Sequence, residues 1–497
     1  MVEKRLETIR SEILEKIRPT PEENERISSI ISEITDILKK WNDTHEQYPY
    51  AFISPQGSTG IKQSHLREDS DIDLFIFLDP EDYRDIINAS QKNRTKISEL
   101  FRKYCDDWVI PALIEKNFNE FYIAYAEHPY VSSTLHGYDI DIVFSFILSE
   151  EHLQKRGPIT AVDRTFYHSK FIQENLSLEQ IDDVRILKMF FKNNYSYGDK
   201  APIARGGFIG YAAELWIHHF GDIWSYFRNF KTLPYVAIDF FNRSSENLRE
   251  IPRFQNDFLL LIDPTDENRN VGSSISERGW IYCLKQIDKF LNTPDARILT
   301  QKLLPSFDLS QEEINQHFVV VESIQISDSH YTKIRDKLYS IAESMRTQAS
   351  REFDQSIRFP DVNYSIYFNP NNKRFSLAFY TSQFQITQKY LRQGPKEDRT
   401  RNFEKFQAKH PDLIIKDGYG YVTEKRKFTN FLEMIRAEFK ERMFKEIELV
   451  NISLPRATKY EESLMAIHVL KECILPFQEE LEQILGNIIP KKSSRKR

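Results

Sequence analysis

Two aspartates stand one residue apart at the start of an apolar run, in the order Asp71-Ile72-Asp73. Residues 72–78 are rich in β-branched and aromatic side chains, so we predict a buried strand there. Alternate side chains of a strand share a face, which places Asp71 and Asp73 together. Two neighbouring carboxylates repel each other, and a divalent cation is the usual reason that a protein tolerates them. Carboxylate oxygens suit Mg²⁺, so the pair predicts a magnesium site.

A turn and a second acidic strand extend this pattern. Gly57 lets the backbone approach a phosphate closely, and Ser58 supplies a hydroxyl and amide donors. Residues 138–144 are predicted to form a later strand that carries Asp139 and Asp141 at the same spacing. If the two strands lie close together, the later one supplies a third carboxylate. One acidic pair is a weak motif, but Gly-Ser followed by two acidic strands is much stronger.

Composition narrows the class of protein. A chain of 497 residues is long enough for two to four domains, and 40% hydrophobic residues exclude general disorder. The net charge of −6 gives no overall support for nucleic-acid binding, so such binding needs local basic surfaces. The three cysteines form no CxxC pair, which argues against a zinc knuckle or a disulfide framework and favours a reducing cytoplasm. We expect no membrane span, because no apolar run approaches the ~18 residues required.

The elements around these residues follow from spacing and turn signals. Two N-terminal helices are expected to pack on the catalytic sheet, the second of them capped by Thr20. Residues 178–198 and 211–220 are predicted to be helices, and residues 258–262 a buried strand. Residues 364–368 and 375–379 are predicted to pair as a hairpin. Basic and aromatic residues alternate between 389 and 427, which is typical of a surface for RNA.

Here the motifs resemble a known family. Gly57-Ser58, Asp71-x-Asp73 and a third aspartate on a later strand resemble the nucleotidyltransferase superfamily that includes DNA polymerase beta. Further segments narrow the resemblance to the archaeal (class I) CCA-adding enzymes, which are tRNA nucleotidyltransferases: residues 125–131, 161–168, 185–188, 197–198, 206–211 and 263–271. Residues 392–395 and 425–429 resemble the RNA-binding C-terminal region of that family. The resemblance covers roughly residues 50–430 and is strongest up to residue 291.

The resemblance implies an α+β fold in successive parts. A polymerase beta-like nucleotidyltransferase head with a mixed sheet and helices is expected first, then a helical or mixed central domain and an α+β RNA-binding region. The expected boundaries are 1–155 for the catalytic domain, 156–292 for the nucleotide- and primer-binding domain, 293–482 for the tRNA-binding body and 483–497 for a basic disordered tail.

The resemblance also implies roles for particular residues. Asp71, Asp73 and Asp141 would be catalytic and would hold two Mg²⁺ ions, with a supporting role left open for Asp139. The expected nucleotide-binding residues are Gly57, Ser58, Lys62, Thr165, His168, Lys188, Tyr197 and Arg269. Lys62 stands in for the basic residue that the family places at Ile61, in a loop one residue longer. The expected RNA-binding residues are Glu127, His128, Arg392, Lys425, Arg426 and Lys427.

The implied activity is template-independent addition of C, C and A to the 3′ end of tRNA. The substrates would be CTP and ATP, and pyrophosphate would be released. The enzyme would be cytoplasmic and would contact the acceptor stem and elbow of tRNA. The sequence leaves a homodimer open. Two alternatives stay open as well: another template-independent RNA nucleotidyltransferase that adds part of CCA or a homopolymer, and a non-catalytic RNA-binding relic. The three intact aspartates argue against the relic.

Overall fold

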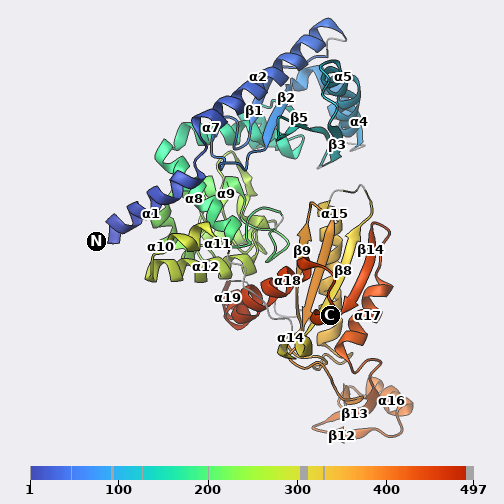
Figure 1. The fold of residues 1–497 in the computed structure, drawn as a ribbon. Helices are drawn as coiled ribbons and strands as arrows, with labels where there is room; N and C mark the ends of the chain where they lie inside the picture. Colours follow the sequence, from blue (N-terminus) through green and yellow to red (C-terminus); the bar gives the residue numbers. More distant parts are fainter. Residues whose placement is uncertain are drawn as a thin grey trace. The chain divides into compact units, whose positions relative to one another are not determined.

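The chain divides into two compact units. The computed structural model describes residues 2–488 except 46–47, 91–94, 126, 200, 303–311, 328 and 330. The first unit comprises residues 1–198, 206–302 and 482–497, and the second comprises residues 199–205 and 303–481 (Figure 1). The mixed sheet and helices expected for a nucleotidyltransferase head are present in the first unit. None of the described helices is long and apolar enough to span a membrane.

A five-stranded mixed sheet organises the first part of unit 1. Its strands are β1 (Phe52–Gln56), β2 (Ile72–Leu78), β3 (Phe121–Tyr125), β4 (Pro129–Leu135) and β5 (Tyr138–Phe146). The order across the sheet is β1-β2-β5-β4-β3, in which β2 and β5 run parallel and every other pair is antiparallel. The strands predicted over 72–78 and 138–144 are therefore confirmed, and they are neighbours.

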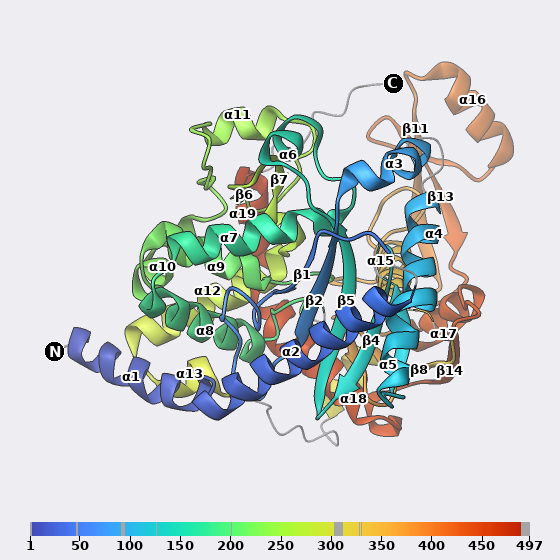
Figure 2. The same cartoon turned by 90° about the horizontal axis from the view of Figure 1, so that it is seen from above.

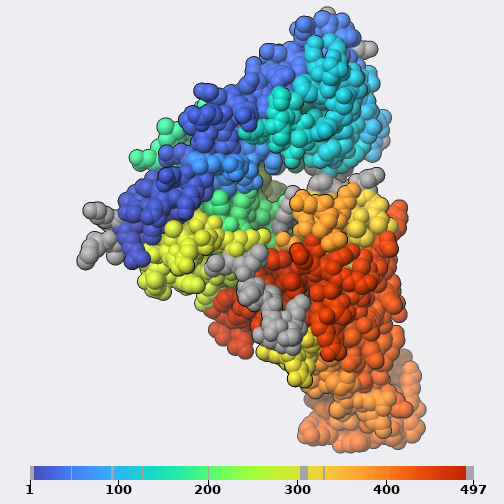
Figure 3. Space-filling view, viewed as in Figure 1, coloured from blue at the N-terminus to red at the C-terminus, as the bar shows by residue number. Residues whose placement is uncertain are grey.

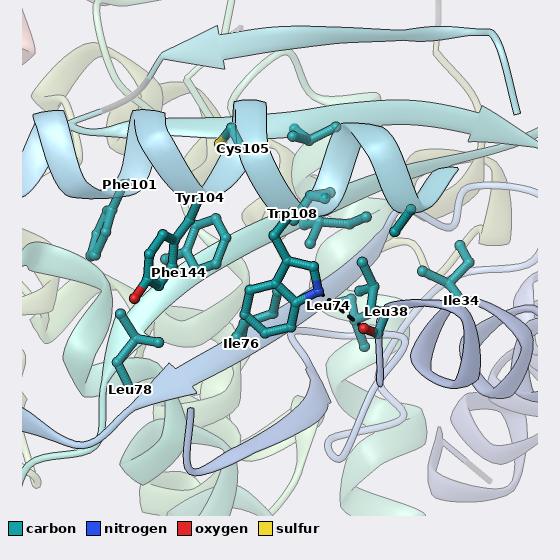
Figure 4. Packing of buried hydrophobic residues seen from close by; sticks show 14 of the residues in the cluster. Ile34, Leu38, Leu74, Ile76, Leu78, Phe101, Tyr104, Cys105, Trp108 and Phe144 are labelled. Atoms are coloured by element: carbon teal, nitrogen blue, oxygen red, sulfur yellow. Dashed lines mark hydrogen bonds between the residues drawn. The ribbon is translucent and has the colours of Figure 1, made fainter. Parts of the chain in front are cut away.

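Helices cover one face of this sheet. They are α2 (Pro21–Thr44), α3 (Arg84–Ser90), α4 (Thr95–Tyr104) and α5 (Ile110–Glu115), with a π-helical turn at Cys105–Val109 between the last two (Figure 2). Trp108 of that turn is fully buried among side chains such as Leu74 and Ile76, and its Nε1 donates a hydrogen bond of 3.0 Å to the carbonyl of Leu38 (Figure 4). Because strand side chains alternate, this packing commits the even-numbered residues of β2 to the core and turns Asp73 to the opposite face.

Helices form most of the remainder of unit 1. They are α1 (Val2–Ile17), α6 (Glu150–Arg156), α7 (Thr165–Asn175), α8 (Leu178–Asn193), α9 (Gly210–Phe220), α10 (Ile223–Asn229), α11 (Ser245–Glu250), α12 (Glu277–Asn292) and α13 (Ala296–Thr300). Thr20 caps α2 as predicted, since its Oγ1 accepts a hydrogen bond from the amide of Glu23. The helix predicted over 178–198 ends at Asn193, and the helix predicted over 211–220 begins one residue earlier, at Gly210.

The prediction of a strand over residues 258–262 is wrong. The segment is buried, but only Ile262 lies in a strand, the two-residue β6 (Ile262–Asp263), which pairs with β7 (Asp266–Asn270). The backbone of the segment is bonded by a short parallel bridge with Ile238 and by the side chain of Asn270, whose Nδ2 donates to the carbonyl of Leu259 at 2.7 Å and whose Oδ1 accepts from the amide of Leu261 at 2.9 Å. Apolar composition predicts burial here, but it cannot distinguish strand pairing from pairing with a side chain.

Unit 2 contains two antiparallel sheets. The larger has the order β14-β8-β10-β9, from β8 (Phe318–Gln325), β9 (Asn363–Asn369), β10 (Arg374–Tyr380) and β14 (Ile447–Ser453). Its core is shared with α15 (Tyr331–Ser350) and α17 (Phe431–Glu441), and β9 and β10 confirm the predicted hairpin. The remaining helices are α14 (Glu312–His317), α18 (Glu461–His468) and α19 (Gln478–Ile488), the last of which crosses the boundary between the units.

A smaller lobe of unit 2 carries many of the basic residues. It is a sheet of order β11-β13-β12, from β11 (Lys389–Lys396), β12 (Ile414–Lys416) and β13 (Tyr419–Lys425), with α16 (Thr400–Lys409) beside it. This lobe projects from the body of unit 2 in both the ribbon and the space-filling view (Figures 1 and 3).

Candidate active site

Two of the predicted metal ligands lie opposite each other on neighbouring strands. The parallel pairing of β2 with β5 aligns Asp73 with Asp141, and the antiparallel pairing of β4 with β5 aligns Ser132 with Asp141. Asp71 lies just before β2, where its carbonyl accepts a hydrogen bond of 2.7 Å from Thr59 Oγ1. The fold thus brings the three aspartates to one end of two adjacent strands.

The surroundings of the two paired carboxylates disfavour their ionisation. Burial raises the pKa of Asp73 to about 7, and Asp141 and Asp71 add to the effect. Burial also raises the pKa of Asp141 to about 6, against a hydrogen bond from Ser132. A cation bound here would oppose both shifts, so the chemistry of the donors fits Mg²⁺. Across the described ranges, no group of three or more His, Cys, Asp or Glu side chains has the arrangement of a metal site. The set of three ligands therefore stays a prediction.

The Gly-Ser turn lies directly against the acidic pair. Gly57 has a φ of +69°, and a Cβ added to it would lie 2.2 Å from Oδ2 of Asp73. Glycine is required here both for its backbone conformation and for the close approach. The carbonyl of Ser58 accepts a hydrogen bond of 2.8 Å from the amide of Ser64, which closes the loop that carries Lys62.

Two of the predicted triphosphate ligands share one buried carboxylate. Lys62 Nζ donates to Glu214 Oε2 at 2.8 Å, and Lys188 Nζ donates to Glu214 Oε1 at 3.3 Å. Ser64 links the same groups, since its Oγ donates to Glu214 Oε1 at 2.7 Å and accepts from Lys188 at 2.8 Å. Burial opposes ionisation of Glu214, but Lys62 and Lys188 outweigh it and lower the pKa of this carboxyl to about 2. Burial lowers the pKa of Lys188 and Glu214 opposes that shift, and with both lysines protonated the cluster has a net positive charge.

Tyr197 lies beside this cluster. A Cβ added to Gly210 would lie 3.1 Å from the hydroxyl of Tyr197 and 3.2 Å from Cε of Lys188, so both side chains pass over a glycine. Burial raises the pKa of Tyr197, and the charges of Glu214 and Asp71 add to this effect.

A second cluster joins His168 and Arg269 through Asp263. Asp263 Oδ2 lies 2.8 Å from Nε2 of His168 and accepts a bond of 2.7 Å from Arg269. Tyr211 stacks on His168 at 4.1 Å and donates from its hydroxyl to Asp263 Oδ1 at 3.1 Å. Lys62 Nζ lies 4.8 Å from the ring centre of the same tyrosine, so Tyr211 connects the two clusters. Burial lowers the pKa of His168 to about 4, which keeps the imidazole neutral near pH 7.

Three other predicted residues lie in different surroundings. Thr165 begins α7, three residues before His168. Glu127 accepts a hydrogen bond of 2.7 Å from the amide of Ala161. His128 Nδ1 lies 2.8 Å from Ser98 Oγ, which holds the ring against α4.

The remaining predicted RNA-binding residues lie in the small lobe of unit 2 and beside it. Arg392 donates to Glu424 at 2.6 Å, and Arg426 donates to Glu352 at 2.6 Å. Lys425 and Lys427 are exposed. The arginines are thus already paired with carboxylates, and Nζ of Lys427 lies 3.9 Å from Glu441, whereas Lys425 presents its charge to solvent.

Sequence reasoning missed three residues that join the site together: Tyr211, Glu214 and Asp263. Glu214 is the one charged residue of the otherwise apolar run from Tyr211 to Ile217. A carboxylate in such a run needs a buried partner, which is the signal that marks it. Nothing in the sequence indicates that its partners lie in α8 and in the loop after the Gly-Ser turn.

The comparisons with known proteins agree with this geometry. A family model described as nucleotidyltransferase domain matches residues 57–176, which include the three aspartates. A second, described as tRNA nucleotidyltransferase, second domain, matches residues 182–300, which include Lys188, Glu214 and Arg269. Two successive segments of the chain are therefore similar to two domains found in nucleotidyltransferases.

Curated relatives extend the match to most of the chain. The CCA-adding enzyme of Methanocaldococcus jannaschii is 25% identical over 91% of this chain and 93% of its own length. That of Methanothermobacter thermautotrophicus is 26% identical over 86% of this chain and 87% of its own length. That of Thermoplasma acidophilum is 33% identical over 57% of each chain. The resemblance to archaeal CCA-adding enzymes seen in the motifs is thus confirmed over nearly the whole length.

Proposed function

We propose that this chain is a CCA-adding tRNA nucleotidyltransferase that adds C, C and A in order to the 3′ end of tRNA from CTP and ATP. The observation that carries the proposal is the alignment of Asp73 with Asp141 across parallel strands, in a chain that is similar to CCA-adding enzymes over nine-tenths of its length. A cytoplasmic location, where tRNA and both nucleotides are available, is part of the proposal.

The reaction joins the 3′ oxygen of the RNA to the α-phosphorus of the nucleotide, and the bond to pyrophosphate breaks. Asp71, Asp73 and Asp141 would hold two Mg²⁺ ions. These ions would supply charge neutralisation of the triphosphate and activation of the hydroxyl. The protein itself contributes mainly position and electrostatics, which the rigid pairing of β2 with β5 provides.

The nucleotide would lie across the two clusters. Gly57 and Ser58 offer backbone and hydroxyl donors to the phosphates, and the positive lysine cluster with Tyr197 favours the triphosphate. Thr165, His168 and Arg269 would face the sugar and base. The guanidinium of Arg269 can donate to ring and exocyclic acceptors of cytosine and adenine, and a neutral His168 avoids an additional charge beside it.

The tRNA would be held by both units. Glu127 and His128 lie just before β4, a strand of the same sheet as the aspartates. Arg392, Lys425, Arg426 and Lys427 would contact the phosphates of the acceptor stem and elbow. Exposed lysines beside a small sheet offer sequence-independent attraction for RNA, which suits an enzyme that must accept every tRNA.

The experiment that tests the function offers purified protein three tRNA transcripts, ending before CCA, at C and at CC. CTP and ATP are supplied separately and together, and the 3′ ends are sequenced. We expect two C residues and then one A, with no A on the first transcript when ATP is alone. Addition of only part of CCA or of a homopolymer would favour the alternative transferase, which the departure at Ile61 and Lys62 motivates. No addition would favour a non-catalytic RNA-binding protein.

A further inference from the structure

Glu214 is placed to control the two lysines that the proposed function assigns to the triphosphate. The residue belongs to the first half of α9, is 1% exposed, and faces the loop that follows the Gly-Ser turn. Its two oxygens receive hydrogen bonds from Lys62, Lys188 and Ser64. Every one of these donors comes from a segment outside α9, so Glu214 joins three separate parts of the site.

The two lysines differ in how fully they are bonded. An ammonium group has three donor hydrogens. Lys188 uses them on the carbonyl of Ser64 at 3.0 Å, the hydroxyl of Ser64 at 2.8 Å and Glu214 at 3.3 Å. Among the described residues, Lys62 donates a hydrogen bond to Glu214 alone, and its Nζ lies over the ring of Tyr211. Lys62 therefore keeps donors available for a ligand.

We propose that Glu214 is a positioning residue that holds Lys62 in the nucleotide site and compensates the buried charge of Lys188, so that Lys62 is ready to bind the triphosphate. This inference rests on the proposed function for the identity of the ligand. It explains how Lys62 can act in place of a basic residue at position 61: the carboxylate draws its side chain inward until only 9% of that side chain is exposed. The net positive charge of the cluster then favours an anionic ligand.

The same face of α9 serves the other side of the nucleotide. Gly210 gives room to Tyr197 and Lys188, and Tyr211 supports Lys62 while its hydroxyl reaches Asp263. Glu214 follows Gly210 by four residues, one turn of helix, so both lie on that face. The beginning of α9 thus positions groups for the phosphates and for the base from one rigid element.

The test measures binding of ATP in the absence of tRNA, together with the KM values for ATP, CTP and tRNA. Glu214→Gln keeps the shape and removes the charge, and we expect it to weaken ATP binding about tenfold or more and to raise both nucleotide KM values. The KM for tRNA should stay within about twofold of wild type. Unchanged nucleotide binding in a folded Glu214→Gln protein would overturn the proposal.

Coupling between the residues gives a second readout. Lys62→Met should also weaken ATP binding, and the double variant should lose less than the product of the two single losses, because both changes remove one interaction. Losses that multiply would overturn the proposal. If Glu214→Gln does not fold, the single variant Lys62→Met decides instead: ATP binding that stays within about threefold of wild type would overturn the inference.

A matched control separates positioning from stability. Asp183 lies five residues before Lys188 on α8, about 140° around the helix, is also buried, and pairs with Arg10 at 2.7 Å. Asp183→Asn should lower the melting temperature without changing ATP binding. The order in which the wild-type chain adds C, C and A is read in a different assay. Sequencing of the 3′ ends therefore tests the proposed function, whereas ATP binding without tRNA tests this inference. Failure of one can be told apart from failure of the other.

Discussion

Asp73 and Asp141 are register partners on the parallel strands β2 and β5. Because the strands are neighbours, their carboxylates are held close whether or not a ligand is present, and the pKa of each is raised. Such a pair is costly to the folded protein, which is typical of a site built for function rather than for stability.

The first prediction compares two aspartates of β5. Asp141→Asn should reduce nucleotide transfer about a thousandfold or more, because it removes a charge at the reacting phosphates. Asp139→Asn should retain activity within about threefold, because Asp139 is exposed and its Oδ1 accepts a hydrogen bond of 3.0 Å from Thr134. Single-turnover rates on tRNA ending in CC measure both. Equal losses in the two variants would show instead that Asp139 supports the metal-binding aspartates, a role that the sequence leaves open.

The second prediction concerns the close approach of Gly57 to Asp73. Gly57→Ala should abolish most activity and destabilise the protein by about 1–3 kcal/mol, since the new Cβ would clash with Oδ2 of Asp73 in a left-handed backbone. Gly137→Ala is the control: its φ is +85°, but nothing lies within 4 Å of the added Cβ. It should lower stability by about 1 kcal/mol and leave activity unchanged. Thermal melts and transfer rates that are alike for the two variants would contradict the account.

The third prediction concerns the base. Arg269→Ala removes the guanidinium held by Asp263 and leaves His168 in place. We expect the KM for CTP and ATP to rise about tenfold or more and UTP to be incorporated more often, while the affinity for tRNA stays unchanged. Competition assays with mixed nucleotides measure the selectivity. An Arg269→Ala enzyme that discriminates as well as wild type would remove this residue from base recognition.

The fourth prediction separates neighbouring basic residues beside the small lobe. Lys425→Ala should weaken tRNA binding and reduce the slope of log K against log[salt] by about 1, because its exposed charge is free to contact phosphate. Arg426→Ala should lower stability in addition to weakening tRNA binding, since its guanidinium is buried against Glu352 and stacks over Tyr390 at 4.9 Å. Filter binding at several salt concentrations and thermal melts distinguish the two. A normal salt slope for Lys425→Ala would place the RNA elsewhere.

The acidic strands were predictable because local patterning decides them. A run of β-branched and aromatic residues identifies the strand at 72–78, alternation identifies the strand at 138–144, and the two-residue period of a strand sets the face of the aspartates. The register that sets Asp73 opposite Asp141 is a contact between segments far apart in the chain, so no local pattern contains it. The motifs shared with CCA-adding enzymes supplied that expectation instead.

The partners of the site residues were less predictable. Asp263 meets His168 across 95 positions of the chain, and Lys188 meets Ser64 across 124. Such pairs depend on how α7, α8 and α9 pack, which residue types alone do not determine. The failed strand at 258–262 has the same cause, because its backbone is bonded by the distant Ile238 and by the side chain of Asn270 rather than by a full strand.

The most direct test of the account is sequencing of the 3′ ends that wild type and Asp73→Asn produce on a tRNA transcript lacking CCA, with CTP, ATP and Mg²⁺ present. We expect wild type to end the transcripts in CCA, and Asp73→Asn to leave them unextended while still retaining tRNA in a binding assay. Transcripts that Asp73→Asn completes at the wild-type rate, or wild-type ends that carry any other sequence, would contradict it.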